Sequence, residues 1–491
     1  MSEGDRTPDD HQALRLMQLG RLPEALTVAQ RAIAGRRECV PAHGLVALIL
    51  FNLGRRLEAE EVVANAVEYE LGSADAFDAL AHISMLLGQH HRSNELYRHV
   101  VEISPTIPRF WYNLASSERS FGRLQEAEAA CDRAIALGST EYPSYLLRSE
   151  LRVQTEEHNH IEELELRLRQ SGVDDRARMF LGYALGKELD DLQRFDAAFA
   201  EFSSAAAARR RHLSYDVASD EAKLRRIREV FTTVQQNTSS PKDSGRFIFI
   251  VGLPRSGTTL LERILTGLPG VHSNGETTNF ERALMAGAAG GTGDVFARSA
   301  AADSERVARE YVSRARTDDT ADTVIDKLPM NYLYLAAIRR ALPDAKLVLV
   351  KRSPIDSCFA MFRTLFGEAY PFTYSFEDLA RYYAAYEALI SHFRNLLGVD
   401  LHEVHYEDLV RDAPRVGQTV AQHCTVEWRD TALDVQNNSN VSLTASAAQI
   451  RRPIYASSVG RWRRYHRHLM PLIRRLHGAG VELPPDAFPD R

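Results

Sequence analysis

The chain has 491 residues, of which 44% are hydrophobic and 26% are charged, and its formal net charge is −6. This length predicts two or more domains, and the composition excludes disorder over the whole chain. The small negative charge gives no reason to expect nucleic acid or an acidic membrane as a partner.

The N-terminal ten residues are polar and acidic, unlike a secretory signal peptide. No apolar run approaches the roughly 20 residues of a membrane-spanning helix. The four cysteines have neither metal-ligand nor disulfide-framework spacing: Cys39, Cys131, Cys358 and Cys424. We therefore expect a cytoplasmic protein with reduced thiols, no bound metal and no membrane contact.

Four glycines recur with a period of 34 residues, at positions 20, 54, 88 and 122. In three of these units an alanine follows five residues later and another small residue seven residues after that. Glycine suits the turn between two antiparallel helices, and small residues allow those helices to approach closely. The pattern predicts an all-α array of helix pairs.

This array resembles the tetratricopeptide repeat family over residues 11–215, with a degenerate fifth unit at 155–168 and a sixth at 193–205. The resemblance implies a solenoid whose concave face binds a protein partner. Support of the remaining chain, or self-association as a homodimer, is the alternative. Residues 216–245 are predicted to be a connecting helix followed by a linker, because turn-forming residues cluster at 237–245.

From residue 246 to about residue 480, apolar runs alternate with helical patterns, which predicts an α/β domain with a mainly parallel sheet. Four segments combine strand-like residues with the polar residues that follow them: the strand and loop around 255–259, and the segments 271–276, 323–330 and 346–357. Ligands of such sheets bind at the carboxyl ends of the strands. We therefore expect the site at that edge, and we expect this domain to fold without the array.

The first of these strands leads into a loop bounded by Gly252 and Gly257, which has the glycine spacing of a P-loop. The lysine position of that motif holds Thr258, and a cation stands instead at Arg255. Such a loop binds phosphate-like groups through backbone N–H groups and the helix dipole. Because nucleotide hydrolysis needs the missing lysine, we predict a P-loop-like site for a different phosphate-like group.

Four segments, 254–259, 351–354, 404–409 and 460–462, together resemble the sulfotransferase superfamily in their order and spacing. The likeness is nearest to bacterial sulfotransferases with tetratricopeptide repeats and to tyrosylprotein sulfotransferases. It implies the co-substrate PAPS (3′-phosphoadenosine 5′-phosphosulfate) and an acceptor hydroxyl.

The resemblance also implies site residues. The catalytic candidates are a general base, a cation for the leaving group and the loop cation: Glu276, Lys327 and Arg255. The candidates for binding PAPS lie in the loop, after the fourth strand and near the C-terminus: Arg255, Ser256, Gly257, Thr258, Thr259, Arg352, Ser446 and Arg452.

Several assignments have competitors. His272 is the rival general base, and Asp326 is expected to orient the site. Glu262 is expected to pair with Arg263 or with nearby helix-end groups. Position 360 holds alanine where the family has a serine that contacts the 3′-phosphate, so Ser353 and Ser357 are the nearby substitutes.

The leading hypothesis is a PAPS-dependent sulfotransferase that acts on a polypeptide or glycan acceptor, with protein tyrosine among the candidates and the repeats recruiting the acceptor. A small-molecule kinase with a degenerate loop is a second possibility, against which the missing lysine counts. A catalytically impaired repeat scaffold is a third, and Ala360 favours it.

Overall fold

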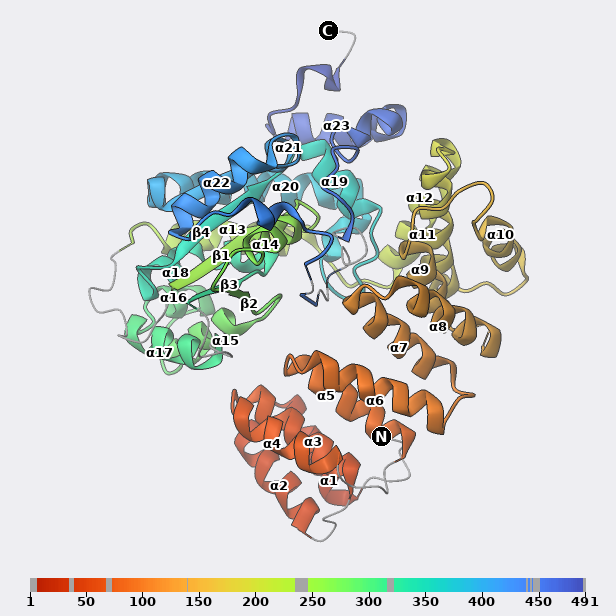
Figure 1. The fold of residues 1–491 in the computed structure, drawn as a ribbon. Helices are drawn as coiled ribbons and strands as arrows, with labels where there is room; N and C mark the ends of the chain where they lie inside the picture. The colour runs from red at the N-terminus through yellow and green to blue at the C-terminus, as the bar shows by residue number, and fades with distance from the viewer. Residues whose placement is uncertain are drawn as a thin grey trace. The chain divides into compact units, whose positions relative to one another are not determined.

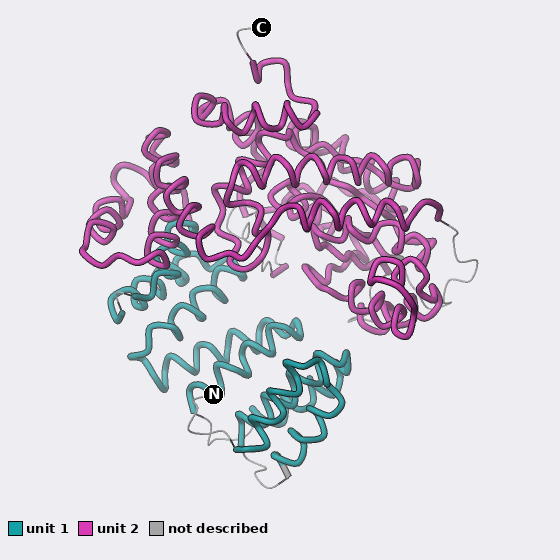
Figure 2. The backbone as a smooth tube through the Cα atoms, turned by 180° about the vertical axis from the view of Figure 1, so that it is seen from behind, with its two compact units in different colours: residues 1–151 teal, residues 152–491 magenta. Residues whose placement is uncertain are grey.

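The computed structural model describes residues 7–34, 39–67, 73–138, 140–234, 246–315, 322–438, 440–441, 444 and 451–488. The chain forms two compact units, residues 1–151 and 152–491 (Figure 2).

Unit 1 is a succession of antiparallel helix pairs (Figure 1). Its helices are α1 (Pro8–Gln18), α2 (Leu22–Ala34), α3 (Val40–Asn52), α4 (Arg56–Val67), α5 (Ala74–Leu86), α6 (His90–Ile103), α7 (Pro108–Phe121), α8 (Leu124–Leu137) and α9 (Tyr142–Glu150). The predicted turn glycines join the first four pairs, with φ of 74°, 78°, 71° and 80° at Gly20, Gly54, Gly88 and Gly122. Only glycine adopts this backbone region without steric cost, so the 34-residue period has a conformational cause.

The recurring alanines lie where the prediction requires them. Ala25, Ala59 and Ala127 have no exposed surface and belong to the hydrophobic cores of this unit. A small side chain at these positions lets paired helices approach closely. The predicted helical repeats are therefore confirmed.

Unit 2 begins with four more helices, α10 (Ile161–Arg169), α11 (Asp175–Asp191), α12 (Phe195–Arg211) and α13 (Val217–Val230). Helices α11 and α12 form a further antiparallel pair, and their turn contains Gln193 with φ of 60° in place of a glycine. Helix α13 corresponds to the predicted connecting helix. The linker predicted at 237–245 lies outside the described residues.

The rest of unit 2 is the predicted α/β domain. Its strands are β1 (Arg246–Gly252), β2 (Val271–Ser273), β3 (Thr323–Asp326), β4 (Lys346–Lys351) and β5 (Leu401–His405). Its α-helices are α14 (Thr258–Leu265), α15 (Asn279–Gly287), α16 (Val295–Ala300), α17 (Ser304–Ala315), α18 (Leu335–Ala341), α19 (Pro354–Phe362), α20 (Phe376–Leu397), α21 (Tyr406–Arg411), α22 (Ala413–Cys424) and α23 (His466–Gly478). Short 3₁₀ turns include η2 (Pro329–Tyr334), η3 (Pro371–Tyr374), η4 (Gly398–Asp400), η5 (Asp430–Leu433), η7 (Arg461–Tyr465) and η8 (Pro485–Ala487).

The five strands form one parallel sheet in the order β2-β3-β1-β4-β5. Strand β1 is central, and its side chains alternate between two buried layers. Phe247 and Phe249 face an aromatic cluster with Phe280 of α15 and Tyr311 of α17. Ile248 and Ile250 belong to an aliphatic cluster formed with α14 and α22. Helices on both faces make this a doubly wound fold, with a ligand edge at the strands' carboxyl ends.

Helices α11 and α12 pack against the α/β domain within unit 2. The Tyr183 hydroxyl donates to the Phe362 carbonyl oxygen at 3.0 Å, and the rings of Phe199 and Phe362 stack with centroids 6.2 Å apart. The compact units divide after Leu151, whereas the predicted array extends to residue 215.

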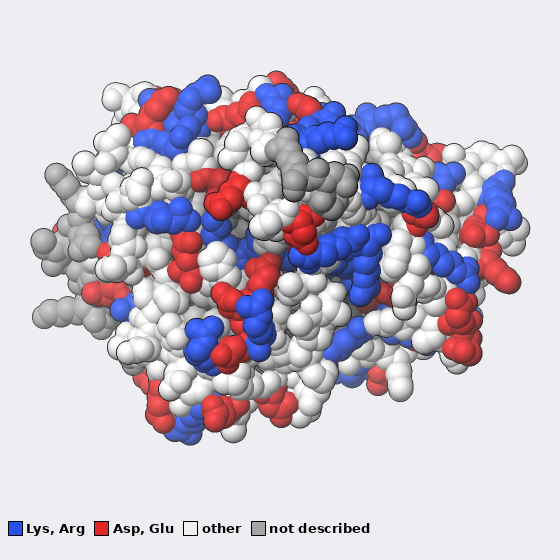
Figure 3. Space-filling view, turned by 90° about the horizontal axis from the view of Figure 1, so that it is seen from above, with Lys and Arg blue, Asp and Glu red and all other residues white. Residues whose placement is uncertain are grey.

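Charged side chains of both signs are interspersed over the face shown in Figure 3. Among the helices of the described residues, none combines the length and apolar content needed to span a bilayer.

Candidate active site

The sequence-predicted site residues follow the carboxyl ends of neighbouring parallel strands. The loop 253–257 follows β1, Lys327 follows β3, and Arg352 follows β4. Glu276 comes three residues after the end of β2. Because all strands run in the same direction, these segments meet at one edge of the sheet.

The loop after β1 has an unusual backbone. Gly252, Arg255 and Gly257 have φ of 154°, 65° and 106°. A Cβ atom on Gly257 would lie 2.5 Å from Cδ2 of Tyr406, so only glycine fits against that ring. Positive φ at the non-glycine Arg255 is a strained conformation of the kind that accumulates at binding sites.

The loop ends at the N-terminus of α14. The side chains of Ser256, Thr258 and Thr259 are buried, and Ser256 Oγ has no hydrogen-bond partner among the described residues. The N–H groups in the first turn of a helix lack intrahelical partners and carry partial positive charge. These features fit a phosphate or sulfate group held against the loop.

Lys327 is the buried cation of this edge, with a side chain that has no exposed surface. Its Nζ lies 2.5 Å from Oε1 of Glu276 and 3.5 Å from Oε2 of Glu262. Burial by itself would lower the pKa of Lys327, but the two carboxylates raise it above its usual value. The site thus contains a buried ammonium whose charged form is favoured by two neighbouring carboxylates, of which Glu276 is partly exposed.

The environment of Glu262 differs from the expectation. Its Oε1 accepts a hydrogen bond from Ser273 Oγ at 2.6 Å, and its other oxygen faces Lys327. Arg263 turns elsewhere, donating through Nε to the Val435 carbonyl at 2.7 Å. The expected pairing with Arg263 is therefore not formed, because Arg263 is buried and its guanidinium donates to backbone carbonyls.

Asp326 is completely buried beside the site. Its two oxygens accept hydrogen bonds from Tyr311 at 3.1 Å and from Asn331 at 2.9 Å. Burial raises the pKa of Asp326 to about 7, against the opposing effect of these hydrogen bonds and of Lys327. Asp326 is thus a fixed, buried carboxyl next to Lys327, and its role in orienting the site stays a prediction.

Arg352 connects the fourth strand to the loop. Its Nη1 donates to the Arg255 carbonyl at 3.2 Å, its Nη2 donates to the Ser458 carbonyl at 2.5 Å, and its guanidinium lies over the Tyr406 ring at 4.8 Å. Its buried Nε has no partner among the described residues. The guanidinium is thus held at the edge of the sheet, with its buried Nε–H free for a ligand.

The substitutes for the missing family serine have different environments. Ala360 is buried in α19. Ser357 Oγ already donates to the Arg352 carbonyl at 3.3 Å, whereas the buried Ser353 Oγ has no partner among the described residues. The Ser353 N–H donates to Glu407 Oε1 at 2.8 Å, which fixes the turn after β4.

The remaining candidates do not all join this group. His272 is exposed on the edge strand β2. Arg452 is half-buried, and Ser446 lies outside the described residues. The arginine in the motif at 460–462, Arg461, pairs with Asp190 of α11.

Sequence reasoning missed two contributors, Ser273 and Asp356. Ser273 links Glu262 to the Gly275 N–H, which donates to Ser273 Oγ at 3.0 Å. Asp356 accepts from the N–H groups of Gly460 and Trp462 at 2.6 and 3.1 Å, which fastens that motif to α19. An acidic residue two positions after the proline of 351–354 was the available signal for Asp356, whereas a lone serine gave none.

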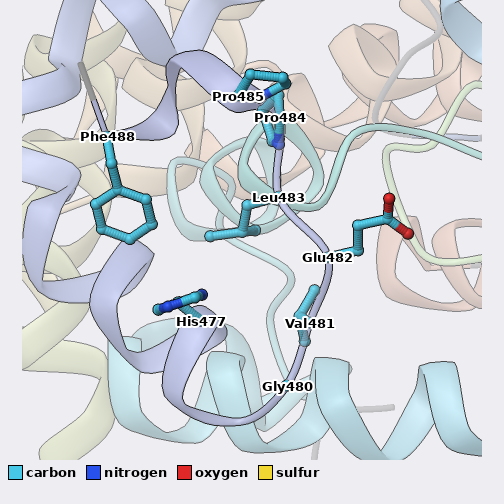
Figure 4. A pocket seen from close by; sticks show the side chains of 8 residues that line it. All are labelled: His477, Gly480, Val481, Glu482, Leu483, Pro484, Pro485 and Phe488. Atoms are coloured by element: carbon cyan, nitrogen blue, oxygen red, sulfur yellow. The ribbon is translucent and has the colours of Figure 1, made fainter. Parts of the chain in front are cut away.

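A separate cavity of about 430 Å³ lies at the C-terminal end of unit 2, lined only by residues between 477 and 488 (Figure 4). The rings of His477 and Phe488 meet there edge to face, with centroids 5.1 Å apart. The lining contains none of the candidate site residues.

The fold and site define an α/β domain with a phosphate-type loop, preceded by helical repeats. Residues 247–430 match the model of the sulfotransferase family, and residues 108–137 match that of the tetratricopeptide repeat. Residues 247–430, in the α/β part of this chain, are thus similar to the sulfotransferase family, whose reaction class is sulfuryl transfer.

Two curated relatives are similar in sequence. A protein of Aquifex aeolicus (strain VF5), described as uncharacterized, is 28% identical over 378 residues, which cover 73% of this chain and 48% of that protein. This chain thus spans about half the length of that relative. Protein-tyrosine sulfotransferase 1 of Danio rerio is 26% identical over 253 residues, covering 46% of this chain and 69% of that protein.

Solved structures with similarity include the sulfotransferase domain from the Synechococcus PCC 7002 olefin synthase. It has 20% identity and a TM-score of 0.35, and the match covers 51% of this chain and all of that domain. A crystal structure of MamA matches with 16% identity and a TM-score of 0.26, covering 36% of this chain and 95% of that protein.

Proposed function

We propose that this protein is a PAPS-dependent sulfotransferase that transfers a sulfuryl group to an acceptor hydroxyl. One observation carries the proposal: a fully buried Lys327 contacts Glu276 at 2.5 Å, at the edge of the sheet where the phosphate-type loop lies. A cation for the leaving group and a carboxylate for the acceptor proton are the two functions that this transfer requires.

The residues present fit PAPS. Ser256 Oγ and Arg352 Nε are buried donors without partners among the described residues. Gly257 leaves no room for a side chain against Tyr406, so the loop backbone packs closely on that ring. We propose that the loop from Arg255 to Thr259 holds the 5′-phosphosulfate and that Arg352 binds the 3′-phosphate. Arg452 and Ser446 are proposed as further contacts to PAPS.

When bound, PAPS supplies a sulfuryl group on a phosphate leaving group. Glu276 takes the proton of the acceptor hydroxyl as the new oxygen–sulfur bond forms. Lys327 and Arg255 stabilise the negative charge that stays on the 5′-phosphate oxygen as the old sulfur–oxygen bond breaks. Neither role needs a metal ion.

For the acceptor we propose a polypeptide, with a tyrosine hydroxyl as the first candidate. Its support is the likeness to the Danio rerio enzyme, whose name gives protein tyrosine as its substrate. The repeats of unit 1 would recruit that polypeptide, since such arrays commonly bind protein segments. A cytoplasmic location belongs to the same proposal.

Calorimetry with two nucleotides tests the donor assignment. We expect 3′-phosphoadenosine 5′-phosphate to bind with micromolar affinity or better and ATP to bind at least about tenfold more weakly, since the loop has Thr258 in place of the lysine that an ATP site uses. Equal affinities would overturn the donor assignment. Incubation with radiolabelled PAPS and a tyrosine-containing peptide library then identifies the acceptor class.

A further inference from the structure

Lys327 lies between two carboxylates that come from different elements. Glu262 belongs to α14, the helix that starts at the phosphate-type loop, and Glu276 follows β2. The exposed fractions of the side chains are 0% for Lys327, 14% for Glu262 and 37% for Glu276. The buried ammonium therefore has one solvent-shielded carboxylate and one that solvent and an acceptor can reach.

Glu262 is also fixed to the segment that carries Glu276. Ser273 Oγ donates to Glu262 Oε1 at 2.6 Å and accepts from the Gly275 N–H at 3.0 Å. The Gly275 carbonyl in turn accepts from the Lys327 N–H at 3.2 Å. A continuous set of hydrogen bonds thus joins Glu262, the residue before Glu276, and the backbone of Lys327.

Other titratable groups face this cluster. Asp326 precedes Lys327 and is held by Tyr311 and Asn331, and its pKa of about 7 results chiefly from burial. Tyr370 interacts with Glu276, and burial together with the charge of Glu276 raises the pKa of its hydroxyl. Neither group makes an ion pair with Lys327 at the distances that the two glutamates do.

We propose that Glu262 is a positioning residue that keeps Lys327 charged, and the segment of Glu276 in place, while Glu276 accepts the proton of the acceptor. This inference rests on the proposed sulfuryl transfer. When the acceptor proton moves to Glu276, that carboxylate becomes neutral and its ion pair with Lys327 is lost. Glu262 then remains as the counter-ion, so the buried ammonium stays protonated at the moment when charge develops on the leaving group.

Without Glu262, protonation of Glu276 would leave a buried ammonium with no carboxylate partner. An unpaired buried ammonium readily loses its proton, because burial disfavours the charged form. Glu262→Gln isolates this effect, since the glutamine carbonyl can still accept from Ser273.

The first test measures thermal unfolding of the ligand-free protein in a double-mutant cycle of Glu262→Gln and Lys327→Met. We expect the double variant to lose less stability than the sum of the two single losses, because Lys327→Met alone leaves two carboxylates facing each other. Additive losses would overturn the interaction between the two residues. This test does not depend on activity.

The second test measures kcat against pH for wild type, Glu262→Gln and a matched control, Glu310→Gln, which removes an exposed glutamate paired with Arg314 on α17. In Glu262→Gln we expect the alkaline limb of the profile to move to lower pH by about one pH unit. This is the smaller end of the pKa shift that a nearby opposite charge produces. The control profile and the KM for PAPS should change little. Superimposable profiles for Glu262→Gln and wild type would overturn the inference.

The two proposals can fail separately. If the wild type transfers a sulfuryl group but the stability losses of the two variants are additive, the role of Glu262 is overturned and the proposed function stands. If the stability losses are not additive but the wild type transfers no sulfuryl group, the proposed function is overturned. The catalytic part of this inference then falls with it.

Discussion

At the scale of single residues, the chemistry depends on how two ionisable groups divide their roles. Lys327 is fully buried, and Glu276 is reachable from solvent, yet the two are in direct contact. In the free site each stabilises the charge of the other. In the proposed transfer, the exposed Glu276 accepts the proton of the acceptor and the buried Lys327 keeps its charge.

Replacing Glu276 with glutamine should therefore separate binding from turnover. The variant removes the proton acceptor but keeps the shape of the side chain, so we expect turnover to fall by about 10²-fold, the usual contribution of a general base. Calorimetry should show nearly unchanged affinity for 3′-phosphoadenosine 5′-phosphate. Normal turnover in this variant, together with inactivity of His272→Ala, would assign the base to His272 instead.

Asp326 gives the folded state a pH dependence of its own. Its pKa is about 7 in the folded protein because of burial, well above the value near 4 of an exposed aspartate. The folded state therefore binds this proton more tightly than the unfolded state does. The resulting contribution to the free energy of unfolding is complete below about pH 4 and is lost as the pH rises to about 7. At higher pH Asp326 is charged in the folded protein, and burial of that charge destabilises the fold.

Asp326→Asn removes that charge and keeps a side chain that can bond with Tyr311, whose hydroxyl both donates and accepts. We expect the unfolding midpoint of this variant, relative to wild type, to increase as the pH rises from about 5 to about 8. Thermal denaturation monitored by circular dichroism across this range checks the trend. A difference that is independent of pH would show that Asp326 does not titrate in this window.

At the scale of elements, the buried Asp190 joins α11 to the C-terminal motif. Its side chain is 1% exposed and accepts from Arg363 at 2.5 Å and from Tyr465 at 2.6 Å, and it also pairs with Arg461. Burial alone would raise the pKa of Asp190, but the two arginines and the tyrosine lower it below its usual value. The carboxylate is therefore charged and fully satisfied.

Asp190→Ala should destabilise the protein by about 3–5 kcal/mol, the effect of removing one partner from a buried ion pair. Urea denaturation measures this loss. Asp196→Ala is the matched control, because Asp196 on α12 pairs with Arg467 and His468 but is 64% exposed, so solvent screens the pair. Equal losses in both variants would contradict a structural role specific to Asp190.

Much of this arrangement could be predicted from the sequence, and the reasons differ between elements. The turn glycines and the loop after β1 depend on local backbone conformation, which sequence patterns record directly. The sequence does not predict strand β5. Only two of the residues in Leu401–His405 are buried, so this edge strand has no continuous apolar run to mark it.

The contacts that sequence could not reveal are those between distant segments. Arg461 pairs with Asp190 from 271 residues away, and Ser273 reaches Glu262 across the space between β2 and α14. Charged residues in a single sequence carry no record of their partners. Lys327 and Arg352 could be placed at the site because both directly follow predicted strands.

At the scale of the whole molecule, the question is where the chain can be divided. Helices α11 and α12 contribute Tyr183, Asp190 and Phe199 to contacts with the α/β domain. The sequence predicts a division between residues 215 and 246, whereas the compact units divide after Leu151. Removal of α11 would leave Arg363 and Arg461 without their carboxylate.

We expect residues 152–491 to form a soluble protein that unfolds cooperatively and binds 3′-phosphoadenosine 5′-phosphate as the full chain does. A protein of residues 216–491 should unfold at a much lower temperature or aggregate, because it exposes the surface that α11 and α12 cover. Calorimetric scans of both proteins decide between the two boundaries. Equal stability of the two would restore the boundary near residue 215.

The most direct test of the central claim is a single-turnover measurement of sulfuryl transfer from radiolabelled PAPS in wild type and in Lys327→Ala. We expect transfer by the wild type and a rate about 10²-fold lower in the variant, because the ammonium acts on charge that develops in the transition state. The affinity for 3′-phosphoadenosine 5′-phosphate should stay within a few-fold. Equal rates in the two proteins, or no transfer by the wild type to any phenolic, peptide or glycan acceptor, would contradict the central claim.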